Sequence, residues 1–299
     1  MNNIIISNAA GTFSSILKYL SWMSTKDINQ NSLNVYFDFQ NKTDFMGNTY
    51  LNYGSSYFPT VTTRRENLIC HFFSNLPNSN FPEDSIFIEQ YPYEIKQIIE
   101  NYPEELLLYE GRGCNIEQYF NICELEKVRK KFNHHLDKLT LSDELNNRIQ
   151  LELGPIFSKK NNILCAMVRY SDHYIGEFSY DSIIEQIKSE MVNFDKLLII
   201  TQISPLISKL KDIFGEKCLY FENRHRVNDY DTDWAGGRNV RMSDTELIKE
   251  TQDCIIDVLA ASRCNFLMGG ASNMMLGALS FNKDLHFKIF NVLSNKIGR

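Results

Sequence analysis

Residues 163–173 read ILCAMVRYSDH, six apolar residues in a row followed by an abrupt polar turn. A strand with one face in water would alternate apolar and polar residues, so this run predicts a strand buried on both faces. Such strands belong to parallel sheets covered by helices. Arg169 and Asp172 then follow the carboxyl end of the strand, where open α/β sheets bind their ligands. The stretch therefore predicts an α/β fold with these two side chains at a binding crevice.

Downstream of this strand, apolar runs alternate with helical patterns. The alternation is typical of a βαβαβ arrangement and predicts a parallel sheet in this half of the chain. In chain order we expect a helix over 182–191, a strand over 196–200, a helix over 205–214, a strand over 218–221, a helix over 251–261, a strand over 265–268 and a helix over 272–279.

The chain opens with a similar unit. The run NIIIS at 3–7 predicts a strand, and a glycine turn then leads into a helical apolar pattern. Residues 35–39 (VYFDF) predict a second buried strand, with Asp38 near its carboxyl end. An irregular stretch rich in aromatic residues follows over 50–119, and two helices are expected over 123–153, ended by Gly154-Pro155.

Length and composition set the domain organisation. A chain of 299 residues exceeds one ordinary domain and predicts two of about 150 residues. We expect an N-terminal Rossmann-like domain over 1–155, with irregular aromatic insertions that would engage an acceptor, and a C-terminal Rossmann-like donor domain over 156–299. Two such domains facing a cleft form the arrangement called GT-B in glycosyltransferases.

Charge and cysteine content exclude several classes of protein. A net charge of −6 argues against a nucleic-acid binder, because phosphate recognition needs a basic face. No apolar run is long enough for a membrane span and the start lacks a basic signal-peptide region, which predicts a cytoplasmic protein and leaves peripheral membrane contact open. The seven cysteines contain no CxxC pair, so they are interpreted as reduced and mostly buried thiols.

Two further stretches carry groups that suit an anionic ligand. In NFLMGGASN, at 265–273, an apolar strand leads through Gly269 and Gly270 to Ser272 and Asn273 at a helix start. Glycines admit close backbone approach, and a helix start binds anions through free N–H groups. Tight packing alone is the alternative interpretation of these glycines.

The polar stretch 223–242 carries Arg224, Arg226 and Arg238. A polar loop of this length inside a compact domain predicts a cover over the donor, with arginines on its phosphates, because long structureless loops are uncommon without a function. A solvated, self-paired surface loop is the alternative. No apolar strand leads into the acidic residues of this stretch, and the adjacent His134 and His135 point to different helix faces, so no metal site is expected.

The order of these motifs resembles the metal-independent fucosyltransferase superfamily of GT-B type, which includes the nodulation and core α-1,6-fucosyltransferases and their α-1,2 relatives. The resemblance covers chiefly residues 160–280. It implies that Arg169 matches the arginine that holds the pyrophosphate of a GDP-sugar, with Met167 at that motif's histidine position. It also implies that Asp257 and Ser262 match a later helix motif of the family. That helix and a strand lead to a helix start with small residues near the donor, which Ser272 matches.

The resemblance implies an inverting glycosyltransferase that needs no cofactor or metal and uses a nucleotide-sugar donor, with GDP-fucose as the first choice. The acceptor would be a glycan hydroxyl, in the synthesis of a bacterial surface polysaccharide or glycoconjugate. Asp172 and Asp38 are the candidates for the general base, since each follows a buried strand. Two alternatives stay open: an enzyme similar to polysaccharide pyruvyl transferases, and a non-catalytic protein that binds nucleotide sugars or glycans.

Overall fold

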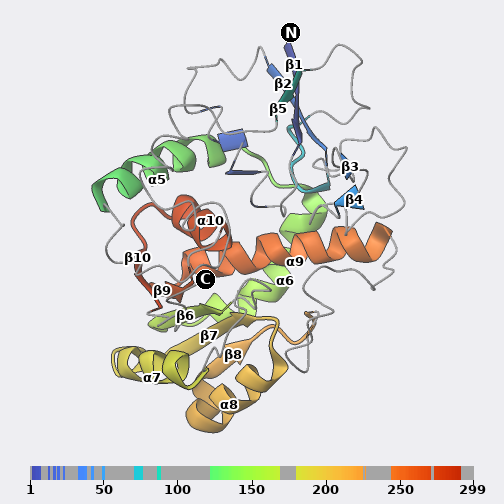
Figure 1. Cartoon of the computed structure of the whole chain (residues 1–299). Coiled ribbons are helices and arrows are strands. Elements are labelled where there is room, and N and C mark those ends of the chain that lie inside the picture. The colour runs from blue at the N-terminus through green and yellow to red at the C-terminus, as the bar shows by residue number, and fades with distance from the viewer. Residues whose placement is uncertain are drawn as a thin grey trace.

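The computed structural model shows an α/β chain with two parallel sheets (Figure 1). It describes residues 2–7, 13, 16–17, 19–20, 23, 33–38, 42–43, 49–50, 71–76, 86–88, 122–168, 180–224, 226, 244–270 and 273–290. The helices, strands and contacts given for the chain are those formed within these residues.

The larger sheet has five parallel strands in the order β10-β9-β6-β7-β8. The chain starts at the central strand, moves to one edge through β7 and β8, and then returns to fill the other side with β9 and β10. This order is that of a doubly wound α/β fold, as the sequence predicts. The strands are β6 (Ile163–Val168), β7 (Lys196–Thr201), β8 (Cys218–Tyr220), β9 (Phe266–Gly269) and β10 (His286–Ile289).

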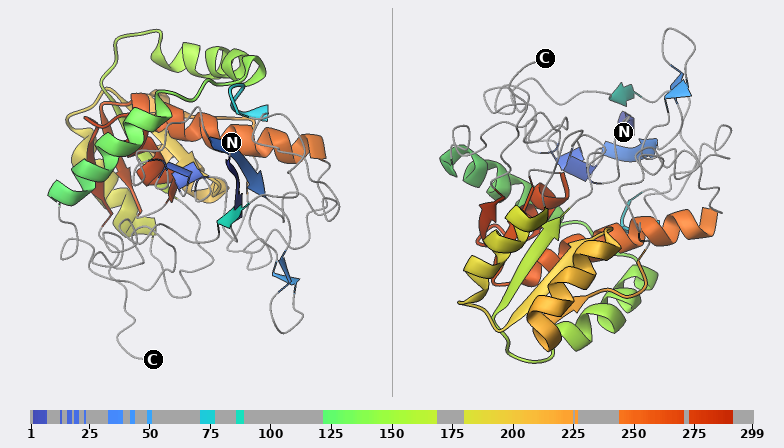
Figure 2. Two further views of the ribbon diagram at one scale, coloured as in Figure 1. Left: turned by 90° about the horizontal axis from the view of Figure 1, so that it is seen from above. Right: turned by 60° about the horizontal axis from the view of Figure 1, so that its bottom comes forward.

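Helices cover both faces of this sheet. The described helices are α5 (Ile122–Leu136), α6 (Asp143–Phe157), α7 (Tyr180–Met191), α8 (Ser204–Phe214), α9 (Asp244–Arg263) and α10 (Asn273–Phe281). Helices α7 and α8 pack on one face, and α9 and α10 pack on the other (Figure 2, right). Because all six residues of β6 are buried, its continuous apolar run is explained by this double cover.

Successive residues of β6 point to opposite faces and enter different cores. Cys165 and Met167 belong to the cluster beneath α9 and α10, whereas Leu164 and Ala166 belong to the cluster beneath α7 and α8. Of the cysteines in the described residues, Cys165, Cys218 and Cys264 are buried and Cys254 is partly buried. The expectation that the thiols are mostly buried agrees with these positions.

Local sequence signals explain where several helices begin and end. Ser142 caps α6 by accepting a hydrogen bond from the Leu145 backbone N–H at 3.3 Å, and two acidic residues follow in the first turn. Pro205 stands at the start of α8, where its missing N–H costs nothing. Gly215 ends α8 with a φ of 54°, a left-handed conformation that glycine adopts without strain.

The smaller sheet has three parallel strands in the order β2-β1-β5. These are β1 (Asn2–Ser7), β2 (Leu33–Asp38) and β5 (Ile86–Ile88), and a separate antiparallel pair joins β3 (Lys42–Thr43) to β4 (Thr49–Tyr50). Asp38 is the last residue of β2 and stands opposite Ser7 in the register. The predicted position of Asp38 at the carboxyl edge of a parallel sheet is therefore confirmed.

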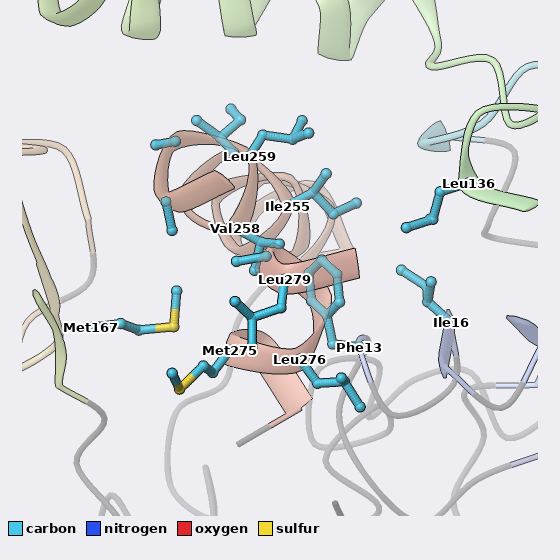
Figure 3. Close-up of a cluster of buried hydrophobic side chains, with 14 of the residues drawn as sticks. Phe13, Ile16, Leu136, Met167, Ile255, Val258, Leu259, Met275, Leu276 and Leu279 are labelled. Carbon is cyan, nitrogen blue, oxygen red and sulfur yellow. The ribbon is translucent and has the colours of Figure 1, made fainter. Parts of the chain in front are cut away.

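One apolar core joins the N-terminal helical residues to the larger sheet. The helical residues Phe13, Ile16, Leu17, Leu20 and Met23 are buried in the same cluster as α9, α10 and β6. In the close-up, Phe13 lies beside Leu276 and Leu279 of α10, while Met167 of β6 lies on the opposite side (Figure 3). In Figure 1, α9 runs across the molecule between the two sheets.

Several elements differ from the sequence prediction, among them the short strands β3, β4 and β5, which are not predicted from the sequence. Helix α6 continues through Gly154-Pro155 to Phe157, because a proline this close to a helix end removes only one backbone hydrogen bond. Helix α9 begins at Asp244, several residues before the apolar pattern that predicts it. Strand β10 is not predicted at all, since HFKI mixes polar and apolar residues in a partly exposed edge strand.

Gly277 of α10 is expected to be sensitive to any added side chain. A Cβ at this position would lie 2.6 Å and 2.7 Å from two ring carbons of Phe13, which is itself buried. Gly277→Ala should therefore lower the free energy of unfolding by about 1–3 kcal/mol, as overpacking of a core does. Urea denaturation measures this loss.

Gly154→Ala is the matched control, because a Cβ there meets no atom within 4 Å. Its gain in helix propensity is offset by the restriction on a residue before proline, so a change below about 1 kcal/mol is expected. Equal losses in both variants would show that the contact with Phe13 is not the cause.

Candidate functional site

Strands β6 and β9 lie side by side where the order of the larger sheet reverses. Their register pairs Ala166 with Met268 and Met167 with Gly269, so both strands end at the same edge. The chain leaves β6 toward β7 on one side and leaves β9 toward β10 on the other. Connections that diverge in this way open a crevice at the carboxyl ends of the strands, the usual ligand position in open α/β sheets.

Gly269, the last residue of β9, marks a close approach of three elements. A Cβ on Gly269 would lie 3.1 Å from Sδ of Met275 in α10 and 3.3 Å from the Met167 carbonyl oxygen in β6. The backbone N–H of Phe290 donates to the Gly269 carbonyl at 2.9 Å. Gly270 follows, and Asn273 is the first residue of α10. The structure thus brings β6, β9 and the start of α10 together at the carboxyl edge of the larger sheet, which is named the ligand edge after the usual ligand position in such sheets.

Arg226 sits at the carboxyl ends of the neighbouring strands. Its guanidinium donates to the backbone carbonyls of Thr201, the last residue of β7, and Phe221, which directly follows β8. Burial lowers the pKa of Arg226 from its ordinary value, opposed by Asp257. An arginine side chain is still charged at any physiological pH. Arg226 therefore places a positive charge on the ligand edge of the sheet.

Arg224 is held by three carboxylates. Its Nε donates to Asp257 Oδ1 at 2.9 Å, and its Nη1 lies 2.8 Å from Glu152 Oε2 and 3.3 Å from Asp253 Oδ1. The guanidinium also stacks on the ring of Phe221 at 4.4 Å. The side chain is 6% exposed, and its Nη2 has no hydrogen-bond partner in the part of the chain that the structure describes.

The Arg224 cluster, made of Arg224, Glu152, Asp253 and Asp257, balances burial against charge. Burial opposes the charge of Arg224, but the three carboxylates together raise its pKa above the ordinary value. Burial raises the pKa of Asp257 to about 6, although the attraction of Arg224 works in the opposite direction. The cluster therefore contains a carboxyl group that can change its charge near neutral pH.

A second arginine extends this cluster across α6 and α9. Arg148 donates to Asp253, to Glu152 at 2.8 Å and to the side chain of Gln252 at 2.7 Å. The Gln252 amide donates in turn to Glu144 at 3.1 Å. Sequence reasoning missed these partners, although Asp253 and Asp257 stand four residues apart and so share one helix face, as do Arg148 and Glu152.

The remaining predicted site residues are spread over the chain. Ser262 lies near the end of α9, where its hydroxyl donates to the Leu259 carbonyl at 2.8 Å and its carbonyl accepts from Asn282 at 2.9 Å. The structure brings Arg224 and Asp257 into contact. It does not bring Ser262 to the edge where Gly269 lies, because Asn265, just after Ser262, hydrogen-bonds with Ile163 at the opposite end of the strands. Arg169, Asp172, Ser272 and Arg238 lie outside the described residues.

In the described ranges, no group of three histidine, cysteine or acidic side chains could hold a metal ion. Of the helices that the structure describes, none is both long and apolar enough to cross a bilayer.

The strand order of the larger sheet is that of a doubly wound α/β protein, and similar structures are known. The NodZ α-1,6-fucosyltransferase soaked with GDP-fucose aligns with a TM-score of 0.50 and 12% identity, over 98% of this chain and 98% of that chain. The NodZ fucosyltransferase from Bradyrhizobium aligns with a TM-score of 0.50 and 14% identity, over 93% of this chain and 91% of that chain. POFUT1 in complex with GDP-fucose aligns at 0.45 with 10% identity, over 97% and 98%.

Sequence comparison gives no further relative: neither a protein-family model nor a curated protein sequence matches the chain. The resemblance stated from the sequence is confirmed at the level of the fold, since both NodZ structures align over more than nine-tenths of the chain. The chain is thus similar in fold to the NodZ α-1,6-fucosyltransferase.

The titration of Asp257 gives a test of the Arg224 cluster. Folding raises the pKa of this carboxyl from 3.8 to about 6, so the stability that its protonated form contributes is present below about pH 4 and is lost as the pH rises through 6. Asp257→Asn cannot titrate. Between about pH 4 and pH 7 the free energy of unfolding of the wild type should fall by a few kcal/mol relative to that of the variant.

Urea denaturation of both proteins over this pH range measures the difference. A carboxylate stabilised mainly by its ion pair with Arg224 would have a lowered pKa in the folded protein. The wild type would then gain stability relative to Asp257→Asn with rising pH, and this result would contradict the interpretation of Asp257 as a buried, proton-binding carboxyl.

Proposed function

We propose that this chain is a glycosyltransferase that moves a sugar from a nucleotide-sugar donor, with GDP-fucose as the first choice, to a hydroxyl group of a glycan. The observation that carries the proposal is the meeting of β6 and β9 at the reversal of the sheet. The two stretches that suit an anion, one starting at Arg169 and one at Gly270, directly follow these strands in the sequence. The likeness in fold to NodZ, a fucosyltransferase, supports the same activity.

The donor diphosphate would bind where these stretches meet. Arg169 would hold it through a bidentate guanidinium, whose geometry matches phosphate oxygens. The chain from Gly269 through Gly270 and Ser272 to Asn273 would offer the free N–H groups of the α10 start. Arg226, held at the ends of β7 and β8, supplies further positive charge at this edge, and Arg238 would approach from the polar stretch.

The described contacts divide the predicted donor-binding residues into two groups. Arg224 and Asp257 are engaged with one another at 2.9 Å, and two further carboxylates surround the same guanidinium. Negative charge of this density opposes the binding of a phosphate, so we assign the diphosphate to Arg169 and the α10 start and leave to Arg224 a contact with a neutral donor group. A role of Ser262 in donor binding is a prediction that rests on the family resemblance alone.

The reaction would be an inverting displacement. An acceptor oxygen attacks the anomeric carbon, the bond from that carbon to the diphosphate oxygen breaks, and a carboxylate takes the proton of the acceptor hydroxyl. Asp172 and Asp38 are the candidates, and Asp38 ends β2 at the carboxyl edge of the smaller sheet. Basic side chains, without a metal, would balance the charge that develops on the departing diphosphate.

We also propose that two Rossmann-like domains bind different substrates. Residues 1–155, with the smaller sheet, would bind the acceptor, and residues 156–299 would bind the donor across a cleft. A cytoplasmic enzyme of bacterial surface polysaccharide or glycoconjugate synthesis fits this arrangement, and membrane contact, if any, would be peripheral.

A donor screen tests the proposed function. Thermal unfolding is measured with GDP-, UDP-, dTDP- and CMP-sugars, and donor hydrolysis is assayed with and without EDTA. A ligand at 100 times its Kd stabilises the folded protein by about 2.7 kcal/mol, which is easily resolved. We expect the GDP-sugar to give the largest shift, with turnover that EDTA leaves unchanged.

The other outcomes of this screen separate the alternatives. Binding without hydrolysis or transfer would favour a non-catalytic nucleotide-sugar protein. Ketal formation from a pyruvyl donor would favour a pyruvyl transferase. Turnover abolished by EDTA and restored by manganese or magnesium would overturn metal independence.

Arg169→Ala should weaken donor binding while leaving the fold intact. Loss of a charge-assisted hydrogen bond to diphosphate costs about 1.5–3 kcal/mol, which is roughly ten- to a hundredfold in Kd. Arg169→Lys should restore part of the affinity, because a point charge cannot reproduce the guanidinium fork. Calorimetric titration with GDP measures both variants.

Arg263→Ala is the matched control. It removes an exposed arginine at the last turn of α9, away from the ligand edge, and should leave the Kd unchanged. If the folded Arg169→Ala protein bound GDP as tightly as the wild type, the diphosphate assignment would be wrong and the arginines of the 223–242 stretch would become the first candidates.

A further inference from the structure

Helix α10 is the element whose start reaches the ligand edge, and its position is set by its surroundings. It is buried on nearly every side, with Met275, Ala278, Leu279 and Ser280 almost inaccessible to solvent. Met275 packs against Gly269 at the start of the helix, and Gly277 lies against the Phe13 ring in its middle. These contacts fix the position of α10 against its neighbours.

The far end of α10 is held by side chains from α5. Arg129 donates from Nε to the Leu279 carbonyl at 3.1 Å, and from Nη2 to the carbonyls of Asn282 and Leu285, both at 2.9 Å. Asn133, one turn further along α5, donates to the Phe281 carbonyl at 3.2 Å. The Leu279 and Phe281 carbonyls belong to the last turn of α10, where carbonyls lack partners within the helix, and the Asn282 and Leu285 carbonyls lie in the turn that follows.

The charge of Arg129 adds to this hold. The residue is 5% exposed, and burial lowers its pKa, opposed by Glu126 and Asp284. The guanidinium is still charged at physiological pH. A cation at the carboxyl end of a helix interacts favourably with the helix dipole, whose positive end then lies at the α10 start. Arg129 therefore stabilises the end of α10 both by hydrogen bonds and by charge.

We propose that Arg129 is a positioning residue for donor binding, because its hold on the carboxyl end of α10 sets where the amino end meets the diphosphate. The inference rests on the proposed function, in which the stretch from Gly270 to Asn273 binds the donor. Nine residues of helix span about 13 Å, so Arg129 acts from beyond contact distance of the ligand. Arg129 touches no reacting group in this account.

The test compares variants of Arg129 and Asn133 by calorimetric titration with GDP. Arg129→Lys keeps the charge but loses the fork that reaches three carbonyls, so the start of α10 is free to shift. Misplacement of a binding group by a fraction of an ångström should weaken GDP binding about three- to tenfold. Asn133→Ala removes only the hydrogen bond to the Phe281 carbonyl and should weaken GDP binding about twofold. This variant still tests the positioning role if Arg129→Lys folds poorly.

Leu210→Ala is the matched control for lost stability. Leu210 is fully buried in α8, within the other core cluster, and its truncation should cost about 2–5 kcal/mol of stability. Because α8 packs on the opposite face from α10, the folded Leu210→Ala protein should bind GDP with wild-type affinity. A role for Arg129 in stability alone would make all three variants bind alike.

Kinetics give an independent readout. The KM for the nucleotide sugar should rise in Arg129→Lys, while the KM for the acceptor should not change. Wild-type affinity for GDP in folded Arg129→Lys and Asn133→Ala would overturn the positioning role and leave the proposed function standing. Failure of the wild type to bind any nucleotide would overturn the proposed function itself, and the role of Arg129 with it.

Discussion

Burial of β6 on both faces is the constraint on which the rest of the fold depends. Its six residues have no polar side chain, and alternate members enter two separate clusters. A strand of this kind is stable only between two layers of helices and with a neighbour on each side, so β7, β9 and the helices on both faces follow from it. The ligand edge is a consequence of the same arrangement, because β6 and β9 are the strands between which the chain changes direction.

Electrostatics organise the part of the molecule that the apolar core does not. Arg224 and Arg148 join α9 to α6 and to the segment after β8 through buried or half-buried carboxylates. Replacing one member of such a network leaves a charge without its partner in a poorly solvated place, which costs more than the pair contributes. The network therefore fixes the relative position of these elements more than it adds to their stability.

The sequence was sufficient for the features that depend on apolar pattern. Strand β6 and the order of helices and strands over 163–281 agree with prediction, because buried strands and amphipathic helices leave a clear periodicity. Strand β10 was not predicted, because an edge strand needs fewer apolar residues. The first turns of α9 escaped because their residues are polar.

Prediction of the candidate site was less complete, and the reason is physical. A strand end or a helix start can be located from local sequence, whereas the partner of a charged side chain depends on residues far along the chain. Arg224 was singled out as a phosphate ligand from its neighbours in the sequence, yet its described contacts are carboxylates from α6 and α9. Arg129 carried no signal in its own helix, since its acceptors lie about 150 residues away.

That separation has a consequence for how the chain folds as it is synthesised. Strand β6 can pair with β7 within about 30 residues, but its other edge waits for β9, whose register begins at Phe266 opposite Leu164. The acceptors of Arg129 emerge later still, at residues 279–285. Contacts between residues this far apart slow folding, because a long loop must close before they form. Until β9 and α10 have left the ribosome, the central strand keeps one edge and part of one face uncovered, and in this interval the nascent protein depends most on protection from aggregation.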